Sequence, residues 1–490
     1  MSTNWSDRPT AGHPVVSLLD NAVAAHPNAP AIETPDRTIT YQELATEVAR
    51  LAAWLNAQGV SPQERIAIRG ERTSLFVTAL LASWCVGAVP APIDGSHPPA
   101  RIARYETAAR AHWTLSLTPG PALVRLEEPG TPVHEDGLSH ILFTSGTTGD
   151  PAAVAVGPEP LRAMASWYSH EFAPGPLDKV GLVGGLGHDP ILRDVIAALL
   201  GSATLVIPEP DVLSMPGRLA DFVERMRLTI LHCTPPLLEF GVLMGAPPER
   251  RLSGLRLILC GGALMSRGIA EQTSRLCDTA RLFNVYGATE TPQVAAAHEV
   301  HTPNSASHDP SDAVPIGTGV AGAVVLLGAE LPDADLNADE IIIRSKNLAL
   351  GYLDDEHSND RFRPDPSGET AYRLYLTGDL GERGANGELY VTGRADRQIS
   401  VNGYRVALQE IEAAALRHPQ IMRASATLES GPRGEVLAIL VAVRDGESVT
   451  PAELRRHLRG ELPSYAVPSA VRFGEPTLDH NHKARIASSG

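Results

Sequence analysis

Two glycines and a run of hydroxyl side chains follow the short apolar segment 141–143 and end before a proline. The run consists of Thr144, Ser145, Gly146, Thr147, Thr148 and Gly149. Glycine allows left-handed φ angles and close backbone approach, while amide N–H groups and hydroxyls can surround an anion. The Gly-Lys-Ser/Thr ending of a Walker A loop is missing. The pattern therefore predicts a phosphate-binding loop of another kind, with a polar surface turn as the alternative.

The bulk composition predicts a multidomain enzyme. The chain has 490 residues, of which 43% are hydrophobic and 20% charged, and its formal net charge is −16. A chain of this length is too long for one ordinary hydrophobic core, so two or more domains are expected. The negative net charge argues against nonspecific binding to nucleic acids or anionic membranes. The N-terminal residues lack a secretory-signal pattern, and no apolar run is long enough to span a membrane. Four widely spaced cysteines suggest neither a disulfide framework nor a zinc site, which favours a reducing cytoplasm.

Hydrophobic periodicity alternates between helix and strand over the first 320 residues. Helices are expected at 41–58, 75–86, 191–200 and 216–226, with strands at 65–68, 180–183, 204–207, 229–231, 255–259 and 281–284. Such alternation predicts parallel-type sheets covered by helices. Shorter strands at 323–327, 340–343 and 388–391 predict a small β-rich subdomain. The last hundred residues predict a small α+β domain, with a hairpin at 398–406, helices at 408–417 and 451–462, and a strand at 436–443.

Six motifs occur in one order along the chain. They read ITYQEL at 39–44, TSGTTG at 144–149, NVYGATE at 284–290 and YLTGDL at 375–380, followed by the run from Gly393 to Glu412 and by Lys483. In this order and spacing the chain resembles an amino-acid-activating adenylation domain of the nonribosomal peptide synthetase type, within the acyl-adenylate-forming superfamily. The resemblance covers nearly the whole sequence. It implies a large domain at 1–395 that binds ATP and the amino acid, and a small mobile domain at 396–490.

The resemblance implies ATP and Mg²⁺ as cofactors. A carboxylate attacks the α-phosphate of ATP to give an acyl-adenylate and pyrophosphate, and a thiol or amine then accepts the acyl group. Glu290 is the implied magnesium ligand and Asp379 the acceptor for the ribose hydroxyls. The hydroxyl residues of segment 144–149 would hold the β- and γ-phosphates. The remaining implied nucleotide contacts are Tyr286, stacked on adenine, and Gly287, Thr289 and Arg394.

Lys483 is the implied catalytic cation beside the carboxylate and the α-phosphate. The sequence contains only three lysines, and a lysine on a frayed C-terminal tail is the plainer reading. Two positions depart from the pattern of the family: His482 replaces a glycine, and Ala152 replaces a lysine of a mobile loop that contacts the leaving phosphates. We expect the change at Ala152 to weaken pyrophosphate stabilisation without removing the reaction centre. Asp396 is the implied hinge, about which rotation would exchange Lys483 for the Gly403 loop.

Asp189 and Pro190 open the helix predicted at 191–200. Asp before Pro is ordinary helix-start chemistry, so Asp189 can be read as a simple N-cap. The resemblance implies instead that Asp189 pairs with the α-ammonium of the substrate. Arg193 lies on the same helix face. Its partner could be a polar or anionic substrate side chain or a protein acid such as Glu239, or Arg193 could pair outward with Asp194 or solvent. Further positions that resemble pocket-lining residues are Cys233, Leu259, Gly261, Val285 and Gln293, and together they favour a polar or acidic amino acid.

The sequence therefore predicts a stand-alone amino-acid adenylating ligase of natural-product biosynthesis. The expected acceptor is the phosphopantetheine thiol of a separate carrier protein, because the chain ends soon after Lys483. The resemblance also allows for a small activating partner protein. The alternatives are a carboxylate–CoA or amide ligase of the same superfamily, and a degenerate noncatalytic binding subunit suggested by Ala152 and His482.

Overall fold

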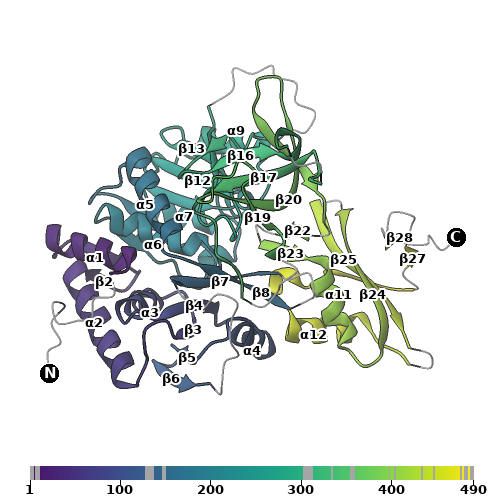
Figure 1. Cartoon of the computed structure of the whole chain (residues 1–490), viewed down its shortest axis with the longest axis horizontal. Helices are drawn as coiled ribbons and strands as arrows, with labels where there is room; N and C mark the ends of the chain where they lie inside the picture. The colour runs from purple at the N-terminus through teal and green to yellow at the C-terminus, as the bar shows by residue number, and fades with distance from the viewer. Residues whose placement is uncertain are drawn as a thin grey trace.

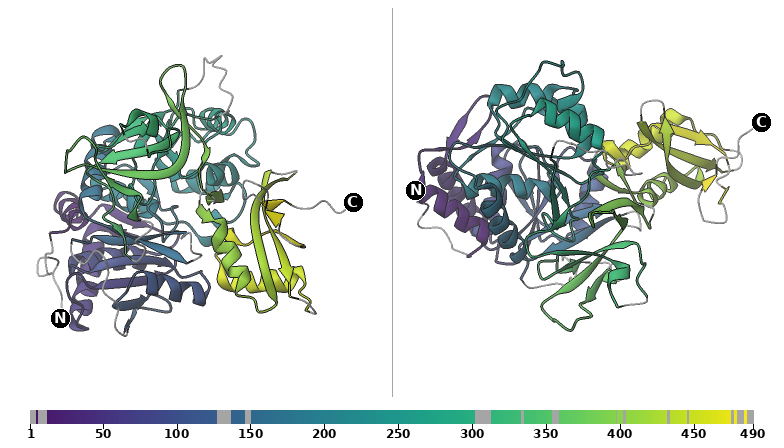
Figure 2. Two further views of the ribbon diagram at one scale, coloured as in Figure 1. Left: turned by 45° about the vertical axis from the view of Figure 1, so that its right-hand side comes forward. Right: turned by 90° about the horizontal axis from the view of Figure 1, so that it is seen from above.

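The computed structural model describes Trp5 and residues 12–126, 137–145, 150–301, 313–332, 335–353, 359–396, 398–401, 404–431, 434–444, 447–474, 477–478 and 484–485. A large helix-and-sheet body holds most of the chain, and a smaller C-terminal unit projects from one side of it (Figure 1). A β-rich portion of the body borders the C-terminal unit. Figure 2 shows the same arrangement from two further directions.

A nine-stranded sheet forms the centre of the large body. Its order is β15-β14-β13-β12-β11-β9-β10-β1-β2, with parallel pairing from β13 to β1 and antiparallel pairing towards both edges. The strands are β1 (Pro30–Glu33), β2 (Thr38–Thr40), β9 (Lys179–Gly181), β10 (Thr204–Val206), β11 (Ile230–Cys233), β12 (Leu257–Gly261), β13 (Arg281–Tyr286), β14 (Ala296–Glu299) and β15 (Thr318–Gly319). The parallel strands direct their carboxyl ends to one edge, where open α/β sheets bind ligands.

Two smaller sheets complete the first half of the body. The four-stranded sheet has the order β4-β3-β5-β6, and the three-stranded sheet has the order β18-β8-β7. Their strands are β3 (Arg65–Gly70), β4 (Val89–Asp94), β5 (Trp113–Ser116), β6 (Ala122–Arg125), β7 (His140–Ser145), β8 (Pro151–Val156) and β18 (Gly351–Tyr352). β7 and β8 pair antiparallel, so the predicted phosphate loop connects two strands of one hairpin.

Helices cover these sheets and enclose the apolar cores of the body. They are α1 (Pro14–Ala25), α2 (Tyr41–Ala57), α3 (Ser74–Cys85), α4 (Pro99–Ala108), α5 (Glu159–Phe172), α6 (Pro190–Leu200), α7 (Arg218–Met226), α8 (Pro235–Leu238) and α9 (Arg267–Leu276), with short helices at Pro210–Leu213 and Glu239–Leu243. α2 starts where its sequence predicts, because Thr40 and Glu43 form a capping box. α6 is buried from Ile191 to Leu199, although it carries Arg193 and Asp194.

The β-rich portion and the C-terminal unit have cores of their own. The β-rich sheet has the order β16-β17-β20-β19, with β21 paired to β20. Its strands are β16 (Val324–Leu327), β17 (Glu340–Ser345), β19 (Phe362–Pro364), β20 (Arg373–Arg383) and β21 (Leu389–Arg394), with a short helix at Gly328–Glu330. The C-terminal unit contains β22 (Gln398–Val401), β23 (Tyr404–Ala407), α11 (Leu408–Leu416), β24 (Ile421–Gly431), β25 (Gly434–Val443), α12 (Pro451–Glu461), a short helix at Ser464–Ala466, β26 (Ala470–Phe473), β27 (Thr477–Leu478) and β28 (Ala484–Arg485).

The predicted fold class is confirmed: an α/β body with a small β-rich portion is followed by a small α+β unit. The division at 395/396 stays a prediction. The expectation that Ala152 lies in a mobile loop is wrong, because Ala152 lies on β8 and pairs with Thr144 of β7. Within the described ranges, no helix has both the length and the apolar character needed to cross a bilayer.

Half-buried His13 and fully buried His140 join the N-terminal helix to β7. His13 Nε2 lies 2.7 Å from Ser139 Oγ, which lies 3.1 Å from His140 Nδ1. The His13 ring also stacks on Trp84. Burial lowers the pKa of both histidines from 6.5 to about 3. Both side chains are therefore neutral in the folded protein at neutral pH.

We expect this pair to make the fold sensitive to acid. Below pH 6.5 the unfolded chain binds protons that folded His13 and His140 do not, so the free energy of unfolding falls by ~1.4 kcal/mol per pH unit for each histidine. Urea unfolding of a His140→Leu variant at decreasing pH should show a smaller loss of stability than wild type. The exposed His26 gives the control substitution, His26→Leu, which should keep the full loss. Equal pH slopes for wild type and His140→Leu would contradict the assignment.

Candidate active site

The tip of the β7–β8 hairpin places a buried hydroxyl where the phosphate loop is predicted. Thr144 and Ser145 end β7, and Ser145 pairs with Pro151 of β8. Ser145 is 8% exposed, and its Oγ has no hydrogen-bond partner in the described part of the chain. A buried hydroxyl without a partner is costly, so this Oγ suits an anionic ligand that accepts a hydrogen bond. The other predicted loop residues, Gly146, Thr147, Thr148 and Gly149, lie outside the described residues.

Tyr286, Asp379 and Arg394 are brought together from three strands. Tyr286 ends β13 and its hydroxyl donates to Asp379 Oδ2 at 2.6 Å. Arg394, at the end of β21, donates Nη1 to Asp379 Oδ1. Gly378 precedes Asp379 with a φ of 74°, and a Cβ there would lie 2.8 Å from Arg394 Nη2, so the turn requires glycine. The Thr-Gly-Asp motif is thus a turn that presents a carboxylate.

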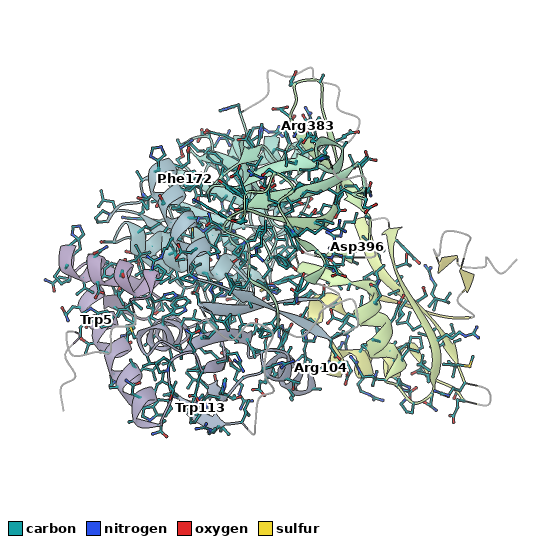
Figure 3. The ribbon with its side chains drawn as sticks, viewed as in Figure 1. Trp5, Arg104, Trp113, Phe172, Arg383 and Asp396 are labelled. Carbon is teal, nitrogen blue, oxygen red and sulfur yellow. The ribbon has the colours of Figure 1, made fainter. Side chains whose placement is uncertain are left out.

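Asp396 belongs to the same network. Arg394 donates Nε to Oδ1 and Nη2 to Oδ2 of Asp396, both at 2.6 Å. Arg361 Nη2 also donates to Oδ2 of Asp396, at 3.1 Å. Burial would raise the pKa of Asp396, but the hydrogen bonds and charge of Arg394 outweigh it and lower the pKa to about 2. Asp396 is therefore an anion at neutral pH. It lies on the border between the body and the C-terminal unit (Figure 3).

Glu290 sits in the turn after β13. It is 2% exposed, and the Tyr352 hydroxyl donates to its Oε1. Burial raises the pKa of Tyr352, so this hydroxyl keeps its proton and remains a donor. Thr289 is half-buried beside Glu290, whereas Gly287 is exposed. Tyr352 and Glu290 are 62 residues apart in the sequence, so no local sequence pattern predicts their contact.

Asp189 is not a helix cap. It occupies the N-cap position of α6, but its side chain makes no capping hydrogen bond. Its Oδ2 accepts the Gln293 backbone N–H at 2.6 Å and its Oδ1 accepts Gln293 Nε2 at 2.5 Å. Burial raises the pKa of Asp189 to about 7, against the opposing effects of Arg193 and Gln293. The plainer sequence reading is therefore wrong for this side chain.

Arg193 turns inward. It is 5% exposed and donates Nη1 to the Gln293 carbonyl at 3.1 Å. Asp194 is also fully buried, so an outward pair between the two is wrong. Glu239 is exposed and is no partner for the buried guanidinium. The partner that the structure shows is the Gln293 carbonyl, and the charge of Arg193 also acts on Asp189, where it counteracts the rise in pKa. A polar or anionic substrate group as the partner of Arg193 stays a prediction.

Asp194 instead holds a buried chain of hydrogen bonds beneath the site. Its Oδ1 accepts His232 Nδ1 at 2.7 Å, and His232 Nε2 lies 2.9 Å from the Tyr168 hydroxyl. Burial lowers the pKa of His232 despite Asp194, so His232 is neutral and Tyr168 donates to it. Oδ2 of Asp194 accepts the N–H groups of Val183 and Gly184, which fixes the segment leading to Asp189. The sequence analysis did not predict these hydrogen bonds among Asp194, His232 and Tyr168.

The other predicted pocket residues lie on adjacent parallel strands. Cys233 ends β11, Gly261 ends β12, and Val285 lies near the end of β13; Leu259 is buried within β12. A Cβ on Gly261 would lie 2.2 Å from the Val285 carbonyl oxygen, so the close approach of the two strands requires glycine. These positions share the edge predicted for ligands.

The C-terminal unit docks beside this edge through its hairpin β22–β23. Tyr404 of β23 packs against His188 with ring centres 4.9 Å apart. A cavity of about 330 Å³ lies between the two parts, with Asp94, His97, His188, Tyr404, Arg459 and Tyr465 in its wall. Lys483 and Gly403 lie outside the described residues. β28 contacts β24 at the outer end of the unit (Figure 1).

Two ion pairs from α4 hold the docked unit. Arg101 of α4 pairs with Glu410 of α11, and their side chains are only 4% and 2% exposed. Arg104 pairs with Glu461 at 2.7 Å and lies on the same border (Figure 3). The Arg101–Glu410 pair joins positions 309 residues apart, so sequence periodicity offered no signal for it.

These residues fit a nucleotide with a magnesium ion. The orphan Ser145 Oγ suits a phosphate oxygen, and the Asp379 carboxylate suits a diol. Among the described residues no three His, Cys, Asp or Glu side chains group to hold a metal. A single buried carboxylate, Glu290, still fits Mg²⁺, which usually binds one or two carboxylates together with phosphates.

Sequence profiles identify the family. The profile of the "AMP-binding enzyme" family matches residues 19–120 and 106–353, and that of the "AMP-binding enzyme C-terminal domain" matches residues 410–484. The chain belongs to the AMP-binding enzyme family. As a member it is an ATP-using, adenylating ligase, and its relatives include nonribosomal peptide synthetases.

Individual relatives agree with the family. Novobiocin biosynthesis protein H of Streptomyces niveus is 30% identical over 94% of this chain and 80% of its own length. The chain spans only 6% to 44% of three synthetases that it matches at 31–33% identity. Two solved structures share the AMP-binding fold. The adenylation domain AlmE of Vibrio cholerae has a TM-score of 0.80 and 22% identity, with 96% of each chain covered. The amide bond synthetase McbA of Marinactinospora thermotolerans has a TM-score of 0.78 and 22% identity, with 96% and 97% covered.

The docked arrangement should depend on the buried pair of Arg101 and Glu410. Removing one partner of a buried pair costs ~3–5 kcal/mol, because the other charge stays buried without compensation. Arg101→Met should therefore release the C-terminal unit, seen as faster proteolysis between Arg394 and Tyr404 and as a larger radius of gyration in solution scattering. In the double variant Arg101→Met with Glu410→Gln no unpaired charge stays buried, so part of the docking should be restored.

The control is Arg472→Met, which breaks a more exposed ion pair with Glu429 inside the C-terminal unit. It should leave cleavage and dimensions unchanged. If Arg101→Met behaves like Arg472→Met, the buried pair does not hold the unit in place.

Proposed function

We propose that this AMP-binding enzyme activates an amino acid as aminoacyl-AMP and passes it to the phosphopantetheine thiol of a separate carrier protein. The observation that carries the proposal is Asp189, a buried carboxylate at the ligand-binding edge of the sheet that does not serve as a helix cap. A buried carboxylate beside a substrate site suits a cationic ligand group. The α-ammonium of an amino acid is such a group.

The nucleotide is assigned to Asp379, Tyr286 and Arg394, which are already joined by hydrogen bonds. Asp379 accepts from the ribose hydroxyls, and Tyr286 packs on the adenine. Thr144, Ser145 and the loop that follows hold the phosphates, with Gly287 and Thr289 at the nucleotide. Mg²⁺, held by Glu290, would neutralise phosphate charge. The carboxylate oxygen of the amino acid forms a bond to the α-phosphorus as the bond to pyrophosphate breaks.

The side chain of the amino acid is assigned to the pocket around Arg193 and Gln293. Both residues are buried, and Arg193 Nε has no hydrogen-bond partner in the described part of the chain. A substrate with polar or acidic groups would satisfy this atom, whereas a bulky apolar one would leave it unpaired. This favours a polar or acidic amino acid.

The second half-reaction is assigned to the docked arrangement. With Tyr404 against His188, the hairpin β22–β23 faces the site. Rotation about Asp396 would bring Lys483 to the carboxylate and α-phosphate for adenylation, and would return the hairpin for transfer. In transfer, the thiolate sulfur bonds to the acyl carbon and AMP leaves. Solved structures of the same fold include an artificially fused adenylation–PCP di-domain and a nonribosomal peptide synthetase protein that contains adenylation and PCP domains, and both support a carrier acceptor. A small activating partner protein belongs to the same proposal.

The competing function is a CoA or amide ligase, which the similarity to McbA favours. An ATP–pyrophosphate exchange screen separates the two. It should cover proteinogenic and unusual amino acids, Asp, Glu and β-amino acids, and the corresponding deaminated acids. We expect exchange with an amino acid and little with its deaminated acid, and a loss of ~100-fold or more for Lys483→Ala, because a cation at the reacting phosphate is removed. The exposed Lys346 gives the control, Lys346→Ala.

Each outcome of the screen bears on one assignment. Undiminished exchange in Lys483→Ala would refute Lys483 as the catalytic cation. Exchange with deaminated acids alone would favour the CoA or amide ligase. Exchange with no acid would support a noncatalytic subunit.

The pKa of Asp189, raised to about 7, predicts a pH-dependent affinity. Below pH 7 the carboxyl is protonated and loses its charge towards an ammonium, so the KM for the amino acid should rise about tenfold per pH unit on the acid side. It should level off above about pH 8, where the carboxyl is ionised. Exchange kinetics across this range give the KM, with the KM for ATP as internal reference. An Asp189→Ala variant should lose the dependence, and a wild-type KM that stays flat across this range would contradict the role of Asp189.

A further inference from the structure

Gln293 binds both charged side chains at the start of α6. Its backbone N–H and its Nε2 donate to the two carboxylate oxygens of Asp189, at 2.6 and 2.5 Å. Its carbonyl accepts Nη1 of Arg193 at 3.1 Å. Asp189, Arg193 and Gln293 are 8%, 5% and 5% exposed, so water takes little part in these contacts. One residue of the β13–β14 turn thus occupies the carboxylate assigned to the substrate.

The backbone of Gln293 is held in an uncommon conformation. Its φ is 76°, in the left-handed region that residues with a Cβ rarely adopt. Such residues persist where the surrounding contacts over-determine them, and they concentrate at ligand-binding sites. Here the contacts to Asp189 and Arg193 hold the turn. The two backbone contacts would remain whatever side chain stood at this position.

The side-chain amide of Gln293 is only half satisfied. Nε2 donates to Asp189, but the buried Oε1 has no partner in the described part of the chain. An amide kept for structure alone normally uses both ends. Nε2 also lies 3.5 Å from the backbone carbonyl oxygen of Asp189. The amide is therefore held by Asp189 through Nε2, and a donor that takes its place at Oδ1 breaks no side-chain hydrogen bond of Gln293 to another described residue.

We propose that the side-chain amide of Gln293 and the ammonium group of the substrate compete for Oδ1 of Asp189. The inference rests on the proposed function, because it takes the substrate to be an amino acid. The amide donor stabilises a buried carboxylate that would otherwise lack compensation. It also lowers the affinity for an ammonium, which has to displace Nε2. An acid without an amino group leaves the Gln293–Asp189 contact intact.

Gln293→Met tests the competition, because it keeps the backbone contacts and similar bulk but removes the amide. The probes are L-glutamate with glutarate, and the fastest amino acid of the exchange screen with its deaminated acid. At about pH 8.5, where Asp189 is ionised, the KM for the amino acid should fall about tenfold, since the competing hydrogen bond to a charged group is gone. The KM values for the deaminated acid and for ATP should stay within about twofold, on the same argument.

Stability should move in the opposite sense to affinity. Loss of the amide leaves Asp189 less compensated, so the melting temperature should fall while amino-acid binding tightens. A merely structural role would lower the melting temperature and raise the KM. Gln293→Gly is the second variant: it removes the amide and also relieves the left-handed backbone, so it remains informative if Gln293→Met folds poorly.

Gln63 offers a matched control. It also has a left-handed φ, of 64°, and its amide is satisfied at both ends by the Leu138 backbone, away from α6. Gln63→Met should lower the melting temperature and leave every KM unchanged.

The outcomes separate the inference from the proposed function. A wild-type enzyme that does not prefer the amino acid over its deaminated acid contradicts the proposed function, and the inference falls with it. A wild-type preference with an unchanged or higher amino-acid KM in both Gln293 variants contradicts the inference alone.

Discussion

Compensation of buried charge is the constraint on which this site depends. Asp189, Asp194 and Glu410 are all withdrawn from water, and each is held by a specific partner: Gln293, His232 and Arg101. A buried carboxylate without hydrogen bonds or a counter-charge would be protonated or would destabilise the fold. The left-handed turn at Gln293, the neutral His232 and the docking of the C-terminal unit each supply a hydrogen-bond donor to one of these buried carboxylates. The positions that matter for chemistry are therefore also positions that organise the fold.

Local signals explain why much of the fold was predictable. The capping box of Thr40 and Glu43 sets the start of α2, and alternating apolar segments predicted the central parallel strands to within a few residues. The order of the motifs predicted the family, which the sequence profiles confirm. The strands also bring Tyr286, Asp379 and Arg394 together, and their assignment to the nucleotide stays a proposal.

The partners within the site were not predictable, because they are distant in sequence. Asp189 meets Gln293 across 104 residues and Asp194 meets His232 across 38, and no periodicity connects such positions. Asp189 followed by Pro190 reads as a helix cap, and only the three-dimensional contact with Gln293 overturns that reading. Ala152 was placed in a loop by family resemblance, whereas pairing with Thr144 extends β8 to include it.

The docked C-terminal unit illustrates how burial changes the response to solvent. Exposed charge pairs are screened by dissolved salt over about 10 Å, but a pair shielded from water feels this screening much less. The Arg101–Glu410 contact, with side chains 4% and 2% exposed, therefore responds little to ionic strength, whereas the more exposed pair of Arg104 and Glu461 is screened more. Breaking the Arg101–Glu410 contact requires water to enter the interface, so hydration of these two side chains, more than salt concentration, sets the cost of separating this part of the interface.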